Sequence, residues 1–158
     1  STHQVSMCQA GHPSPLLLSG NHSVKVLGNG GYPVGLFDLD DFEDIELTLG
    51  EDEALVLYSD GVTEVLSSSA ESFGEERLVQ CITEQVRLGR CADLPECIRW
   101  TVEKWGGPVV QQKGFEVILF TSGPKNKSFK LCPVIFLKTK LSFSKSLNCF
   151  SGCICLVW

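Results

Sequence analysis

The sequence predicts an α+β fold in which a β-sandwich of antiparallel strands is flanked by helices. Three observations support this prediction. The first 60 residues hold five short segments with the alternation or the apolar composition of strands. Apolar residues then recur at helical spacing in two consecutive segments. A last apolar segment, residues 115–121, predicts one more strand. Closely spaced strands favour antiparallel pairing, and strands followed by paired helices favour an α+β sandwich.

The early strands are separated by turn signals. Residues 3–10 alternate in polarity until Gly11-His12-Pro13 interrupts them. Ser19-Gly20-Asn21-His22 predicts a hairpin, and the glycine-rich stretch 28–31 predicts a loop. The predicted strands are residues 3–10, 16–18, 24–27, 45–49 and 54–59.

Two amphipathic helices are predicted after the strands. The first covers residues 75–88, and its apolar face consists of Leu78, Cys81, Ile82, Gln85 and Val86. The second begins at Asp93, where Glu96 three positions later completes a capping box. Trp100 and Trp105 lie on this helix with apolar neighbours, so we expect them to pack rather than to bind a ligand.

Charge is distributed unevenly along the 158 residues. Residues 1–120 carry all 19 acidic residues and 7 of the 13 basic ones, a net charge of −12, whereas residues 121–158 carry +6. The acidic body speaks against nucleic-acid binding, because phosphates would be repelled. No apolar run reaches the length of a membrane span, and no signal peptide is present, so the sequence predicts a cytoplasmic protein without a membrane partner.

The eight cysteines do not form a metal-binding or disulfide pattern. No C-x-x-C pair occurs, and no histidine follows His22, so zinc is not expected. Disulfides are not expected without a secretion signal. Four of the cysteines lie in predicted strands, helices and loops as small apolar residues, and four lie in the tail: Cys8, Cys81, Cys91 and Cys97, and Cys132, Cys149, Cys153 and Cys155.

The most informative segment is L-V-L-Y-S-D-G-V-T-E, residues 55–64. A buried strand stops at Asp60-Gly61, which predicts a tight turn because glycine accepts positive φ. A carboxylate held at the mouth of a buried strand suits a hard cation such as Mg²⁺ or Mn²⁺. The alternative is an ordinary turn after a strand.

Three further segments occur with this one in a fixed order. The four are A-G-H-P-S-P-L-L-L, Y-P-V-G-L, L-V-L-Y-S-D-G-V-T-E and F-G-E-E-R-L, beginning at residues 10, 32, 55 and 73. Over roughly residues 3–120 the chain therefore resembles the C-terminal half of a PPM-type, stage II sporulation protein E-like serine/threonine protein phosphatase. The resemblance implies a partial PPM-type β-sandwich, with two sheets between helical layers.

The resemblance also implies a centre of two Mn²⁺ or Mg²⁺ ions, in which Asp60 is a metal ligand. It places the backbone of Ala10, Gly11, His12 and Gly61 near that site. We expect His12 to support the turn before Pro13 rather than to act in catalysis, because the glycine and prolines around it are explained by turn chemistry.

Two groups of ligands that the resemblance implies are missing from the sequence. An acidic G-G-D-F-Y-D segment, which lies upstream of A-G-H in the family, does not occur. The Asp-Asp pair that opens the last strand in the family is replaced by Lys113-Gly114, and a lysine would repel a dication. Glu116 is the one nearby acid and is a weak substitute ligand, about two residues displaced along the predicted strand.

Three functions are therefore open. The chain is a metal-dependent phosphatase whose partner is a phosphorylated regulatory protein of the anti-sigma-factor-antagonist type, or a degenerate phosphatase domain that binds partners, or an inactive gene fragment. The start at Ser1 and the unusual tail favour a fragment. We expect residues 1–121 to form the domain, and residues 122–158, rich in Cys, Lys and Ser, to lie outside it. The sequence does not fix an oligomeric state.

Overall fold

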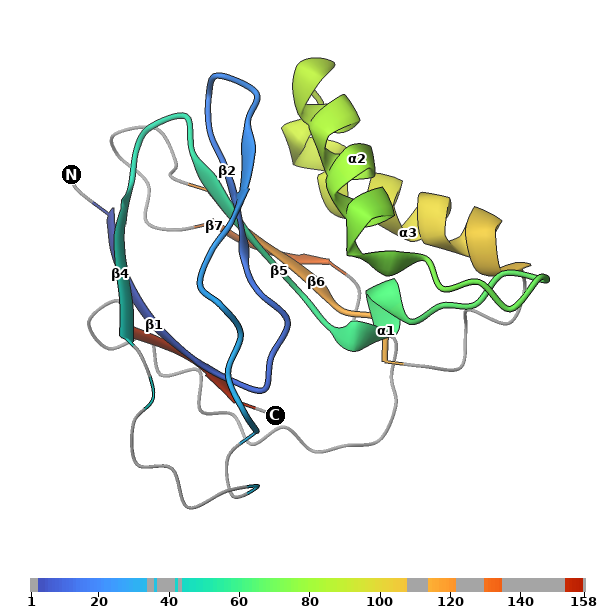
Figure 1. Cartoon of the computed structure of the whole chain (residues 1–158). Helices are drawn as coiled ribbons and strands as arrows, with labels where there is room; N and C mark the ends of the chain where they lie inside the picture. Colours follow the sequence, from blue (N-terminus) through green and yellow to red (C-terminus); the bar gives the residue numbers. More distant parts are fainter. Residues whose placement is uncertain are drawn as a thin grey trace.

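The chain folds into three layers, two β-sheets and a pair of helices, visible in Figure 1. The structure, a computed structural model, describes residues 3–33, 36, 42, 44–107, 114–121, 130–134 and 153–157. Its strands are β1 His3–Ala10, β2 Leu16–Leu18, β3 Val24–Val26, β4 Asp44–Leu49, β5 Ala54–Tyr58, β6 Val117–Thr121, β7 Lys130–Val134 and β8 Cys153–Val157. The helices are α1 Asp60–Thr63, α2 Gly74–Arg87 and α3 Leu94–Gly106, with a short 3-10 turn at Cys91–Asp93.

The strands form one sheet in the order β4-β1-β8 and a second in the order β3-β2-β5-β6-β7. Helices α2 and α3 cover the face of the second sheet that points away from the first (Figure 1). Every described pair is antiparallel except β1–β8, which is parallel. The predicted α+β sandwich of antiparallel strands flanked by two consecutive helices is confirmed.

Strand β5 lies between two hydrophobic cores, which explains why its sequence is apolar at every position. Its side chains at 54, 56 and 58 pack in the core under the helices, with Leu78, Ile82, Leu94 and Ile98. Those of Leu55 and Leu57 pack in the core between the sheets. All five residues of the strand are buried. Successive side chains of a strand point to opposite faces, so one apolar strand serves both cores.

The helices follow the apolar pattern closely, but the predicted capping box is wrong. The buried residues of α2 are Leu78, Ile82 and Val86, as the spacing predicts. Asp93 lies at the start of α3 but makes no side-chain capping bond, since a 3-10 turn leads directly into the helix. Glu96 instead pairs with Arg99, which also pairs with Glu103.

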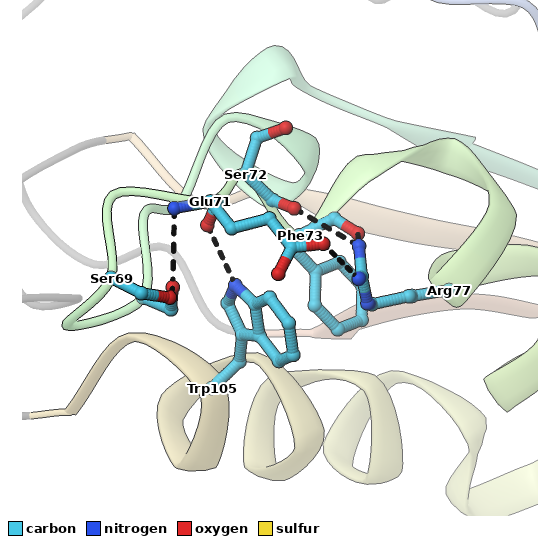
Figure 2. A network of polar contacts seen from close by, with 7 residues as sticks. Ser69, Glu71, Ser72, Phe73, Arg77 and Trp105 are labelled. Atoms are coloured by element: carbon cyan, nitrogen blue, oxygen red, sulfur yellow. Dashed lines mark hydrogen bonds and ion pairs between the residues drawn. The ribbon is translucent and has the colours of Figure 1, made fainter.

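A network of polar contacts fixes the loop between α1 and α2 to both long helices (Figure 2). The Trp105 indole nitrogen donates to the carbonyl of Glu71 at 3.2 Å, and the indole ring meets Phe73 edge-on at 6.2 Å. The Arg77 guanidinium lies 4.2 Å from the centre of the Trp105 ring and pairs with the Glu71 carboxylate. Trp105 therefore packs as expected. Trp100 is 59% exposed, and the centre of its ring lies 4.8 Å from Lys104 Nζ, so this side chain packs on the surface of α3.

Backbone pairing places two tail strands at sheet edges. Strand β7 pairs with β6 in the second sheet, and β8 pairs with β1 in the first. The ranges 122–129 and 135–152 and Trp158 lie outside the described residues. The proposed boundary at residue 121, with the tail outside the domain, stays a prediction. No helix within the described part of the chain combines the length and apolar character needed to cross a membrane.

Candidate metal centre

Three segments meet at one end of the second sheet. In the antiparallel register, Tyr58 at the end of β5 lies opposite Val117 at the start of β6. The start of β2 pairs with β5 through Leu16 and Val56, so the bend before β2 lies at this same end. Figure 1 shows α1 at the lower end of β5, with the start of β6 beside it. The segments expected to surround Asp60 therefore converge.

Asp60 is the first residue of α1, a single helical turn that follows β5 directly. Its backbone carbonyl accepts hydrogen bonds from the Glu64 amide at 2.8 Å and from the Thr63 hydroxyl at 3.3 Å. The side chain of Asp60 is half-buried. The predicted turn at 60–61 is thus a helical turn, and the expected positive φ of Gly61 is wrong.

Gly61 is needed for a close backbone contact. A Cβ atom on Gly61 would lie 2.5 Å from the carbonyl oxygen of Gly114 and 2.9 Å from its carbonyl carbon. No side chain fits between two backbones at that separation. The glycine after Asp60 therefore lets α1 lie against the segment that leads into β6.

Ser59 joins β5 to the beginning of β6. Its hydroxyl donates to the Gly114 carbonyl at 2.7 Å and accepts from the Glu116 amide at 3.0 Å. Its own amide donates to the Glu116 carbonyl at 3.0 Å. Ser59 is 6% exposed, so these bonds replace water for buried groups. Ser59 and Gly61 therefore both hold the 114–116 segment, a role that the turn predicted at 60–61 does not include.

Replacing Ser59 by alanine should lower the free energy of unfolding by about 2 kcal/mol, because the Gly114 carbonyl and the Glu116 amide each lose a buried partner. Urea unfolding followed by circular dichroism measures this change. The matched control is Ser69→Ala, at an exposed serine, which should change stability by less than about 0.5 kcal/mol. Equal effects of the two substitutions would contradict the role given to Ser59.

The bend after β1 is shaped by glycines rather than by histidine chemistry. Gly11 has φ +90°, and a Cβ there would lie 3.0 Å from Pro33. His12 Nδ1 lies 3.0 Å from the carbonyl oxygen of Pro13, a contact that suits the expected turn role of this side chain. Ala10 is 2% exposed.

The sequence did not predict that Gln9 and the loop at 28–31 pack against this bend. Gln9 is 5% exposed, and its side-chain amide donates to the Ser14 hydroxyl at 3.4 Å. The loop predicted at 28–31 folds over Gln9: a Cβ on Gly28 would overlap the Gln9 side chain, and one on Gly31 would overlap its carbonyl. The signal available in the sequence was the cluster of glycines, which marks close backbone approach as well as a loop.

Burial is the main influence on the pKa of Tyr58, the last residue of β5. Burial raises the pKa of Tyr58, and the charge and hydrogen bonding of Glu75 at the start of α2 raise it further. Tyr58 therefore stays neutral at physiological pH.

The described residues do not complete a metal site. Among them, no group of three or more His, Cys, Asp or Glu residues lies close enough to hold an ion. Asp60 is one carboxylate where two cations require several. Glu116 is exposed, and its contact with Ser59 is made by its backbone amide. Gly114 has no side chain that could bind a metal, and Lys113 lies outside the described residues. The donor set that the described residues offer does not fit a dinuclear centre.

Comparisons with known proteins bear on the family and the fold of this chain. The family model of stage II sporulation protein E (SpoIIE) matches residues 1–109. The chain belongs to this family. Among curated proteins, no relative matches. The SpoIIE match spans the bend, β5, α1 and both long helices, whereas the 114–116 segment and β6 lie beyond its end.

Two solved structures share the fold. The PP2C domain of SiaA from Pseudomonas aeruginosa superposes with a TM-score of 0.60 at 19% identity, over 75% of this chain and 46% of that one. The RsbU and RsbW domains of a Mycobacterium tuberculosis protein give a TM-score of 0.56 at 19% identity, over 75% of this chain and 32% of that one. This SpoIIE-family chain therefore has a PPM-type fold and spans less than half of either neighbour.

Proposed function

We propose that this chain is part of a Mn²⁺- or Mg²⁺-dependent phosphoserine/phosphothreonine protein phosphatase of the bacterial sigma-factor-regulation type. Its substrate is a phosphorylated regulatory protein of the anti-sigma-factor-antagonist type, acted on in the cytoplasm. Asp60 holds one of two metal ions in the complete domain. When bound in the complete domain, such ions would supply an activated water as the nucleophile. Asp60 contributes a carboxylate that its strand and α1 hold in place.

The convergence of Asp60, the 10–12 bend and the 114–116 segment at one end of a sheet carries this proposal. The carboxylate is half-buried at the end of a fully buried strand, so its backbone is fixed on both sides. The SpoIIE match and the two PP2C-type neighbours support the reaction class.

We expect this chain alone to release no p-nitrophenol from p-nitrophenyl phosphate in the presence of Mn²⁺. Its described residues offer one carboxylate to the centre, and two bridged cations require more. A colorimetric assay with and without Mn²⁺ measures this, with an intact SpoIIE-family phosphatase as the positive control. Mn²⁺-dependent turnover that is lost in Asp60→Ala would contradict the expected inactivity while supporting the role of Asp60.

The role of Asp60 is tested in a longer protein. If the coding DNA upstream of Ser1 holds the G-G-D-F-Y-D segment in frame, Asp60→Asn in the resulting protein should lower Mn²⁺-dependent hydrolysis by about a hundredfold or more, since it removes a direct ligand. Glu64→Gln, an exposed acid one turn later in the chain, is the matched control and should leave the rate nearly unchanged. Equal losses from both substitutions would argue against Asp60 as a ligand.

A second function, a phosphatase-like module that binds a phosphoprotein without hydrolysis, is favoured by one observation. Lys113-Gly114 stands where the family has two aspartates, so even a longer protein lacks those ligands. Such a module predicts phosphoprotein binding that is unchanged by EDTA. An in-frame stop codon upstream of Ser1 would favour the third reading, an inactive gene fragment.

A further inference from the structure

The Cys81 thiol of α2 contacts the face of α3 that carries Thr101 and, one turn earlier, Cys97. The Cys81 thiol donates to the Thr101 hydroxyl at 3.5 Å. The Thr101 hydroxyl in turn donates to the backbone carbonyl of Cys97, one turn earlier on α3, at 2.8 Å. Cys81 of α2 therefore lies against the part of α3 that holds Cys97 and Thr101. Figure 1 shows that α2 and α3 pack beside one another.

Neither thiol has a part in the candidate metal centre or in a disulfide. Both residues are half-buried and unbridged. Cys81 borders the core under the helices. Residues four positions apart on a helix share one face, so Cys97 lies on the same side of α3 as Thr101, the residue that the Cys81 thiol contacts. We expect this to bring the Cα atoms of Cys81 and Cys97 within the range of about 4.4–6.8 Å that a disulfide spans.

We propose that Cys81 and Cys97 are a redox modification site, at which a peroxide converts the two thiols into a disulfide that ties α2 to α3. The proposal is independent of phosphatase activity. Hydrogen peroxide first oxidises one thiolate to a sulfenic acid, releasing hydroxide. The second thiolate then attacks that sulfur and displaces its oxygen as water, so two thiols and one peroxide yield one disulfide and two waters.

The surroundings of the pair set its reactivity. Burial raises the pKa of the Cys81 thiol, the hydrogen bond to Thr101 opposes this effect, and the neighbouring Cys97 adds to it. A thiol that is less readily ionised reacts more slowly with peroxide than an exposed thiol of ordinary pKa. We therefore expect the crosslink to form over minutes to hours and to resist weak reductants once formed.

Peptide mapping of the oxidised full chain tests the proposal directly. Trypsin alone leaves Cys91 and Cys97 in one peptide, because no Lys or Arg separates them. Adding a glutamate-specific protease cuts after Glu84 and Glu96, so the disulfide should appear as peptide 78–84 linked to peptide 97–99. This species should be present after peroxide treatment and absent after reduction.

Single substitutions give the matched controls. Cys81→Ser and Cys97→Ser should each abolish the linked peptide, whereas Cys91→Ser, at a half-buried cysteine in the turn between the helices, should leave it intact. Closing a loop of this size should raise the Tm of the oxidised chain by about 5–10 °C. Oxidation of the folded wild-type chain that yields Cys81 linked mainly to Cys91, or sulfinic acids at 81 and 97 without a bond, would overturn the proposal.

Discussion

Gly61→Ala should lower the free energy of unfolding by about 3 kcal/mol, close to the upper end of the cost of overpacking. The added methyl group would lie 2.5 Å from the Gly114 oxygen and 2.9 Å from the Gly114 carbon, and backbone atoms cannot rotate away as a side chain can. Relief requires α1 and the 114–116 segment to separate. That movement would also displace Asp60, the residue before Gly61.

Gly114→Ala is the matched control for this prediction, because it adds the same methyl group on the other side of the same contact. A Cβ on Gly114 would meet none of the described residues within 4 Å, and its φ is not positive. We expect its effect to stay below about 0.5 kcal/mol. Urea unfolding of both variants measures the difference, and comparable losses would show that backbone approach is not the constraint at Gly61.

Phe73→Ala should cost about 4 kcal/mol, within the range for truncating a buried aromatic residue. Phe73 is 1% exposed, packs in the core under the helices and meets Trp105 edge-on. Its backbone amide donates to the Val65 carbonyl at 2.8 Å, a bond that the substitution leaves in place, so the loss comes from the ring. Loss of the ring leaves a cavity that neither helix can fill without moving.

Thermal or urea unfolding, followed by tryptophan fluorescence, reports on this variant because Trp105 touches the ring. Leu66→Ala is the control from the same loop: Leu66 is 56% exposed and should cost less than about 0.5 kcal/mol. A Phe73 variant that is as stable as the wild type would mean that the loop and Trp105 repack without the ring.

The elements that the sequence predicted well are those with a clear apolar period. Strand β5 is apolar at every position because it faces two cores, and α2 shows its buried stripe at three- and four-residue spacing. The start of α3 was harder to predict, because Asp93 and Glu96 fit a capping box by type and spacing. The preceding 3-10 turn and the Arg99 partner of Glu96 override that local preference.

The strand end at the candidate site was predictable, the contacts around it were not, and the role of Asp60 as a metal ligand stays a prediction. The strand end at Asp60 could be read from a local pattern. The contact of Gly61 with Gly114 and the overlap of Gly31 with Gln9 join segments far apart in the chain, and no local periodicity encodes them. A glycine in a sequence signals either positive φ or close approach, and the two are separated only by knowing what lies next to it.

Because β5 contributes side chains to both cores, neither core can melt while the other stays intact. If the helices separate from the second sheet, the side chains of β5 on that face lose their contacts. If the two sheets separate, the side chains on its other face lose theirs, so the loss of either core destabilises the other. Denaturation of the described region should accordingly proceed as a single all-or-none transition, with fluorescence and circular dichroism midpoints that coincide.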